Sequence, residues 1–182
     1  MANLQELLLK QLLSGDALAG ISQASGVATN DVSKILTSAL PSLLTGATNQ
    51  TASASTAASF AQALMDHSKK DTSNLTSFFG KVDKTDGAKI IGHLLGKTEA
   101  DTAAEVATKA GVSKSAVSSV LAVAAPLVMS LLGKQANANN SNQNSILSTV
   151  GALLGGKDLG KIATAAIASA AISAIKKQAS KK

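Results

Sequence analysis

The stretch TAAEVATKAGVSKSAVSSVLAVAAPLVMSLLG, residues 102 to 133, is the longest sustained apolar pattern in the chain. It holds two helical patterns separated by Gly111. A glycine here can take the left-handed conformation that ends a helix, and Ser113 can then cap the next one. Apolar residues recur at helical spacing from Val117 to Leu131. Pro126 lies inside this run, and it predicts a kink or a new helix start because it has no amide hydrogen.

A similar stretch, LAGISQASGVATNDVSKILTSALPSLLTG, spans residues 18 to 46. The two stretches match at a constant offset of 85, which pairs Gly26 with Gly111 and Pro41 with Pro126. The pairing predicts two copies of one helix-turn-helix-like unit, at about residues 4–46 and 88–133.

The remaining sequence favours an all-α, multihelical fold, because no segment shows the alternation that is typical of strands. Aromatic residues make up only 2% of the chain, so aliphatic side chains must form the core. We expect a helical domain over residues 1–133, an Asn-rich linker over 134–145 and a separate Ala/Lys-rich helical segment over 146–182. Within the domain we expect three further helices, at residues 3–13, at 57–67 and from 88 onward, and Asn3 is the predicted N-cap of the first. We also expect a loop at 46–56 and turns at 68–74 and 83–87.

The formal net charge of +6 is concentrated at the C-terminal end. Residues 157–182 hold six lysines and one aspartate, so the rest of the chain carries only +1. Lysines at the end of a helix complement its dipole, and the Ala-rich helix favours packing or self-association through small residues. The alternative is contact with an anionic membrane surface or a nucleic acid through the cluster Lys176, Lys177, Lys181 and Lys182.

Three motifs resemble the YidB-like bacterial family, a domain of unknown function. They are a helix that ends in Asp66-His67, the segment DGAKIIGHLLG at residues 86–96, and the Ala-Pro-x-x-Met unit at residues 125–129. The resemblance covers about residues 1–155. It implies an all-α fold and no known catalytic activity.

A local resemblance connects VATKAGVSKSAVSSVL, residues 106–121, with the helix-turn-helix of LacI-type repressors. Residues 21–36 repeat this pattern. Such proteins expose the first part of the second helix to the major groove of DNA. The corresponding residues here are Asn30, Lys34, Lys114, Ser115 and Ser118.

The charge balance argues against a dedicated DNA reader. Residues 101–133 have no net charge, residues 16–46 carry −1, and the chain has no arginine. Because phosphate neutralisation supplies most non-specific affinity, a structural helix–turn–helix corner is the favoured interpretation.

The sequence has no recognisable catalytic, cofactor or metal motif. It contains no cysteine and only two histidines, His67 and His93, which lack the spacing of metal ligands. We therefore expect both to be partly buried structural residues, although Gly92 and Gly96 beside His93 permit close approach of another chain or helix. DKTDG, residues 83–87, lacks the distal acid of a calcium loop and predicts a plain turn.

The leading functional hypothesis is a non-catalytic helical interaction or assembly module with a protein partner, either itself or another chain. A DNA-binding or nucleoid-associated protein is the first alternative. A peripheral membrane protein that binds through the basic C-terminal helix is the second. We expect a cytoplasmic location, because no secretory signal is visible and no run reaches the roughly 18 uncharged apolar residues of a membrane span.

Overall fold

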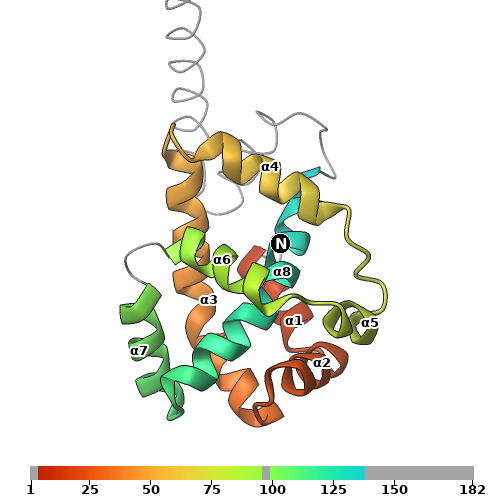
Figure 1. The fold of residues 1–182 in the computed structure, drawn as a ribbon, viewed down its shortest axis with the longest axis vertical. Coiled ribbons are helices and arrows are strands. Elements are labelled where there is room, and N and C mark those ends of the chain that lie inside the picture. The colour runs from red at the N-terminus through yellow and green to blue at the C-terminus, as the bar shows by residue number, and fades with distance from the viewer. Residues whose placement is uncertain (1–3, 96–98, 138–182) are drawn as a thin grey trace, which may run out of the picture.

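The computed structural model describes residues 4–95 and 99–137, and they form helices without any strand in these two ranges (Figure 1). The all-α, multihelical prediction is confirmed. Asn3 and the predicted C-terminal helical segment, residues 146–182, lie outside the described residues. The helices are α1 (Leu4–Leu12), α2 (Gly15–Ser25), α3 (Thr29–Ala52), α4 (Ala57–Ser68), α5 (Leu75–Gly80), α6 (Lys84–Leu95), α7 (Glu99–Ala110) and α8 (Lys114–Asn137).

Helix α8 is the centre of the fold, as its apolar sequence predicts. All ten residues from Leu121 to Ser130 are buried. Helices α4 and α6 pack along it, and α2 and α7 also contact it (Figure 1). Contrary to the sequence expectation, α8 is long and apolar enough to cross a membrane. However, 78% of its most apolar stretch is buried inside the domain, as in the core helix of a globular protein.

Both predicted glycine turns have the left-handed conformation that the sequence calls for. The φ angle is +76° at Gly26 and +68° at Gly111. The amide of Gly26 donates to the Ser22 carbonyl over 2.9 Å, which closes α2. At the start of α8, the Ser113 hydroxyl accepts a hydrogen bond from the Ala116 amide over 3.2 Å.

The offset of 85 that relates the two sequence stretches also relates the two long helices. Helices α3 and α8 each have 24 residues, and both their first and their last residues differ by 85. Eight buried residues of α3 have a buried residue of α8 at this offset. The α3 set is Val32, Ile35, Leu36, Ala39, Leu40, Leu43, Ala47 and Thr51, and the α8 set is Val117, Val120, Leu121, Ala124, Ala125, Val128, Leu132 and Ala136.

The helices around these two pack in a reciprocal way. Helix α2 packs on α8 as well as on its own neighbour α3, and α7 packs on α3 as well as on α8. Helices α1 and α6 likewise each contact both α3 and α8. Helices α4 and α5 lie between the two three-helix units in sequence, with α4 against α8 and α5 against α2.

Neither proline ends its helix. Pro41 and Pro126 both lie inside continuous helices, so of the two predicted outcomes, a kink or a new helix start, the new start does not occur. Pro126 cannot donate to the carbonyl of Ala122, which leaves that buried oxygen free for another contact. Gly87 of α6 lies directly against this oxygen, where a Cβ atom would overlap with it. The proline and the glycine together let α6 and α8 pack at close range.

Three predicted boundaries are wrong. Helix α3 continues to Ala52 through the first part of the predicted loop at residues 46–56, where the hydroxyls of Thr48 and Thr51 donate to carbonyls of the same helix. Helix α6 begins at Lys84 within the predicted turn, since the Asp83 carboxylate accepts from the Thr85 amide. Helix α8 extends to Asn137, four residues into the predicted linker, with Ala136 buried.

Candidate functional site

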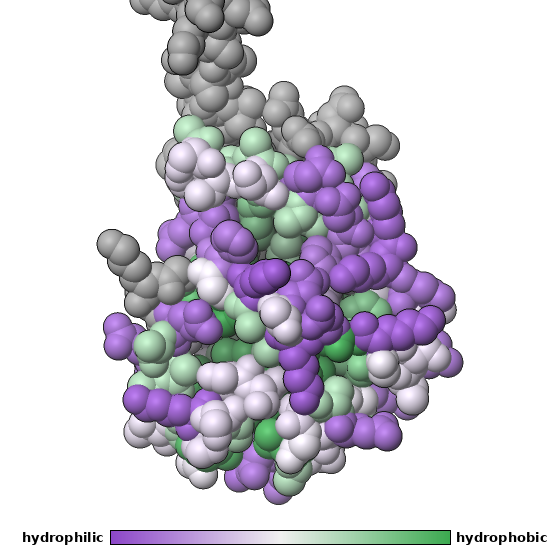
Figure 2. Space-filling model, viewed as in Figure 1, coloured by the Kyte–Doolittle hydropathy of each residue, from purple (hydrophilic) through white to green (hydrophobic). Residues whose placement is uncertain are grey.

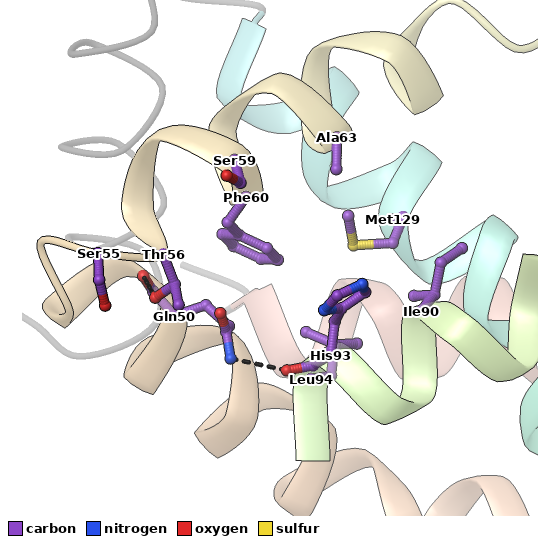
Figure 3. Close-up of a pocket in the computed structure, with 10 residues that line it drawn as sticks. All are labelled: Gln50, Ser55, Thr56, Ser59, Phe60, Ala63, Ile90, His93, Leu94 and Met129. Carbon is purple, nitrogen blue, oxygen red and sulfur yellow. Dashed lines mark hydrogen bonds between the residues drawn. The ribbon is translucent and has the colours of Figure 1, made fainter. Parts of the chain in front are cut away.

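An apolar cavity of about 280 Å³ lies where α3, α4, α6 and α8 meet (Figure 3). Figure 2 shows it as a hollow with hydrophobic surface at its bottom, between α4 and α6. We call this site the apolar cavity. Its lining consists of Gln50, Ser55, Thr56, Ser59, Phe60, Ala63, Ile90, His93, Leu94 and Met129.

The floor of the apolar cavity is made of well-packed side chains. Phe60, Ile90, Leu94 and Met129 are each at most 8% exposed. They come from three helices, so the cavity exists only when the whole domain is folded. Large buried apolar side chains in a concave site favour an apolar ligand, which gains by leaving water.

The rim of the apolar cavity is polar and carries no carboxylate or lysine. The Gln50 side chain donates to the backbone carbonyl of His93 over 2.7 Å, which ties the end of α3 to α6 (Figure 3). Thr56 donates to the Gln50 carbonyl over 3.0 Å and so orders the turn between α3 and α4. These bonds fix the mouth of the cavity without using the side chains of His93 or Ser59.

His93 differs from its prediction. Its side chain is exposed rather than partly buried, and its ring lies toward the apolar cavity between Phe60 and Met129 (Figure 3). No described helix approaches Gly92 closely, since a Cβ there would meet only the Glu99 carboxylate, at 3.5 Å, and approach of another chain at Gly92 stays a prediction. Gly96 lies outside the described residues. Close helix contact occurs instead at Gly87 of the same helix.

A second hollow, of about 500 Å³, lies at the other end of α6 and has a charged rim. Lys70 pairs with Asp86 across it, with 3.8 Å between Nζ and Oδ2. Hydrogen bonds from Ser73 to Asp71, and from the Thr85 amide to Asp83, hold the pKa of each of these exposed carboxyls below its ordinary value. The rim therefore carries both positive and negative side chains, and it offers a ligand no surface of uniform charge.

His67, beside the second hollow, is buried as predicted. It is only 9% exposed, and its Nδ1 atom has no hydrogen-bond partner among the described residues. Burial lowers the pKa of His67, and the nearby Lys70 lowers it further, while the carboxylates of Asp86 and Asp66 oppose the shift. The imidazole is therefore held in its neutral form.

The described residues place no three His, Asp or Glu side chains together as a metal site. In the apolar cavity His93 is the one titratable side chain, and within residues 4–95 and 99–137 no hydrogen bond joins its ring to a hydroxyl or carboxylate.

The five candidate DNA contacts of the helical domain are all exposed. Asn30 and Lys34 lie at the start of α3, and Lys114, Ser115 and Ser118 lie at the start of α8. Both helices begin at the lower end of the molecule in Figure 1. Lys34 is engaged with Asp31 of its own helix over 3.4 Å, which reduces the positive charge it offers. The candidate contacts Lys176, Lys177, Lys181 and Lys182 lie outside the described residues.

Two of the three motifs behind the family resemblance, at residues 86–96 and 125–129, meet where α6 packs on α8. Asp86 and His93 stand two turns apart on α6, and Pro126 and Met129 stand one turn apart on α8. Asp86 and Pro126 line the second hollow, whereas His93 and Met129 line the apolar cavity. The motif residues therefore flank the α6–α8 contact on both sides.

A family model described as "Bacterial protein of unknown function (DUF937)" matches residues 7–135 of this chain. The chain belongs to this DUF937 family. Searches of curated proteins and of solved structures gave no match. The matched range ends two residues before α8 does, so both hollows lie within the DUF937 part of the chain.

Sequence reasoning missed the apolar cavity. The sequence predicts a helix at residues 57–67, which includes Phe60, and His93 drew attention separately, but nothing in the sequence connects the two residues. Gln50 was placed in a loop, although it occupies the last turn of α3. The cavity depends on how four helices cross, and local periodicity carries no information about that crossing.

Proposed function

We propose that this DUF937 domain is a non-catalytic binding module, and that the apolar cavity receives aliphatic side chains of a protein segment. The observation that carries the proposal is the pairing of a buried apolar floor with an uncharged, hydrogen-bonded rim. Ligand sites commonly combine such a floor with a few polar groups that fix orientation. The absence of a partner for the His93 ring among the described residues favours binding over catalysis.

Two finer features belong to the same proposal. We place the chain in the YidB-like group of the family, on the strength of the three motifs at residues 66–67, 86–96 and 125–129. We also interpret α1–α3 and α6–α8 as an internal repeat, which the common offset of the long helices supports. A cytoplasmic location and a protein partner complete the proposal.

Methionine labelling gives a direct test, because the chain has only three methionines. Met129 lines the apolar cavity, and Met65 packs outside it. The full chain, with ¹³C in its methionine methyl groups, would be titrated with 1-octanol and followed by NMR. We expect the Met129 signal to shift in a saturable way while the Met65 signal stays in place.

A filled cavity provides the control for this titration. Ala63→Phe places a ring in the apolar cavity and should abolish the shift of Met129. Ala58→Phe adds the same ring to an exposed position of α4 and should leave the shift intact. Equal shifts of the Met129 signal in the two variants would overturn the proposal.

DNA binding is the second candidate, and the observation that favours it is the common orientation of α3 and α8. Their exposed first turns lie at one end of the molecule (Figure 1). The described ranges hold ten lysines and ten acidic residues, so the folded part has no net positive charge. That balance makes DNA binding the weaker proposal.

A further inference from the structure

We propose that the occupant of the apolar cavity is a segment of this same chain, residues 146–154, with the sequence ILSTVGALL. This inference rests on the proposed binding function. The ligand would thus belong to the chain itself, and the Asn-rich residues 138–145 would connect it to the end of α8. The cavity would then be self-occupied until a competing partner displaces the segment.

The length of the connection supports an internal occupant. Met129 lines the apolar cavity, and α8 ends eight residues later, at Asn137. At a helical rise of about 1.5 Å per residue, the chain must return about 12 Å to reach the cavity. A flexible chain of eight residues, the length of segment 138–145, has an average end-to-end span of about 14–17 Å. The average span of the connection therefore matches the distance to the apolar cavity. Under this condition the effective concentration of the segment at the cavity is high, on the order of millimolar.

Chemical complementarity selects the segment. Residues 138–156 contain no charged side chain, and the rim of the apolar cavity has no carboxylate or lysine. Ile146, Leu147, Val150, Leu153 and Leu154 recur at the spacing that puts apolar anchors on one face of a segment, as in peptides that bind hydrophobic grooves.

The rest of the tail fits this cavity poorly. Residues 157–182 contain six lysines, and the cavity offers no carboxylate to pair with them. Desolvating unpaired ammonium groups against an apolar floor is costly. The family match also ends at residue 135, so the tether and the segment both follow the part of the chain that the family shares.

Engineered cysteines test the proposal cleanly, because the natural chain contains none. The full chain would carry Val150→Cys together with Ala63→Cys, whose side chain lines the cavity. The matched control replaces Ala63→Cys with Gln62→Cys, the adjacent exposed residue of α4, which has the same tether length. We expect intramolecular disulfide formation under mild oxidation to be about tenfold faster for the Ala63 pair, because the docked segment holds the two thiols together in that pair only.

Polar substitution supplies the second control. Leu153→Asn combined with Leu154→Asn should reduce the rate of the Ala63 pair to that of the Gln62 pair. Equal rates for the two pairs in the unsubstituted segment would overturn the proposal. Disulfides that form only between chains, at a rate that rises with protein concentration, would also overturn it and would assign the cavity to a second copy.

The octanol titration distinguishes a wrong internal occupant from a wrong binding function. If the disulfide rates are equal but octanol shifts the Met129 signal, the cavity binds and the internal occupant is wrong. If octanol shifts no signal even in the Leu153→Asn, Leu154→Asn chain, the proposed binding function fails as well.

Discussion

At the scale of single residues, Gly87 shows how closely α6 and α8 approach. Its Cα lies against the Ala122 carbonyl that Pro126 leaves without its helical donor. Gly87→Ala should therefore lower the free energy of unfolding by about 2–3 kcal/mol, as overpacking against rigid backbone does. Urea denaturation of the full chain would measure the change.

Gly92 on the same helix is the matched control for Gly87. A Cβ at Gly92 meets only a flexible carboxylate oxygen, at 3.5 Å. Gly92→Ala should therefore leave stability unchanged or raise it by about 0.5–1 kcal/mol, because alanine favours the helix. Equal losses for both alanine variants would contradict the close contact at Gly87.

The buried imidazole of His67 makes stability depend on pH. Burial lowers its pKa below the ordinary value of 6.5, so the unfolded chain binds this proton more readily than the folded chain. The contribution of the neutral His67 ring to the free energy of unfolding is therefore fully present above about pH 6.5. This contribution is lost as the pH falls toward the lower pKa of the folded state.

A substitution isolates this pH effect. His67→Leu removes the titrating group, so its stability should fall less than that of the natural chain between pH 7 and about pH 5. A His67→Leu chain with an undiminished loss at acidic pH would show that other groups cause it.

At the scale of helices and turns, the two helix starts differ by one hydroxyl. Ser113 accepts from the Ala116 amide, whereas Ala28, which precedes α3, has no side chain to do so. Ala28→Ser should raise the free energy of unfolding by about 0.5–1 kcal/mol, and Ser113→Ala should lower it by a similar amount. Thermal unfolding would measure the stability of both variants. A loss of stability in Ala28→Ser would show that a hydroxyl at residue 28 does not cap α3 in the way that Ser113 caps α8.

Much at this scale could be predicted from the sequence. Gly26 and Gly111 identified both turns, and the unbroken apolar run of α8 indicated its burial. The end of α3 could not be predicted, since TNQTA has weak helix propensity. Buried Ala47 and Thr51 hold it in the helix through contacts with distant elements. The apolar cavity was unpredictable for the same reason.

At the scale of the whole molecule, the neutral charge of the folded part leads to a prediction about DNA. If the chain binds duplex DNA, Lys34→Glu with Lys114→Glu should leave the affinity and its salt dependence unchanged. Replacing Lys176, Lys177, Lys181 and Lys182 by glutamine should remove the binding, because the excess positive charge lies there. Filter binding over a salt series would distinguish the variants, and loss of binding in the first one would make the DNA reader the leading function.

The reciprocal packing of α2 on α8 and of α7 on α3 has a consequence for how such a molecule can arise. A polypeptide of half this length would leave the inner side of its long helix bare to water. Two such polypeptides would cover each other in the same crossed manner. If α1–α3 and α6–α8 are an internal repeat, as we propose, the domain corresponds to two subunits of an intertwined homodimer that α4 and α5 join into one chain.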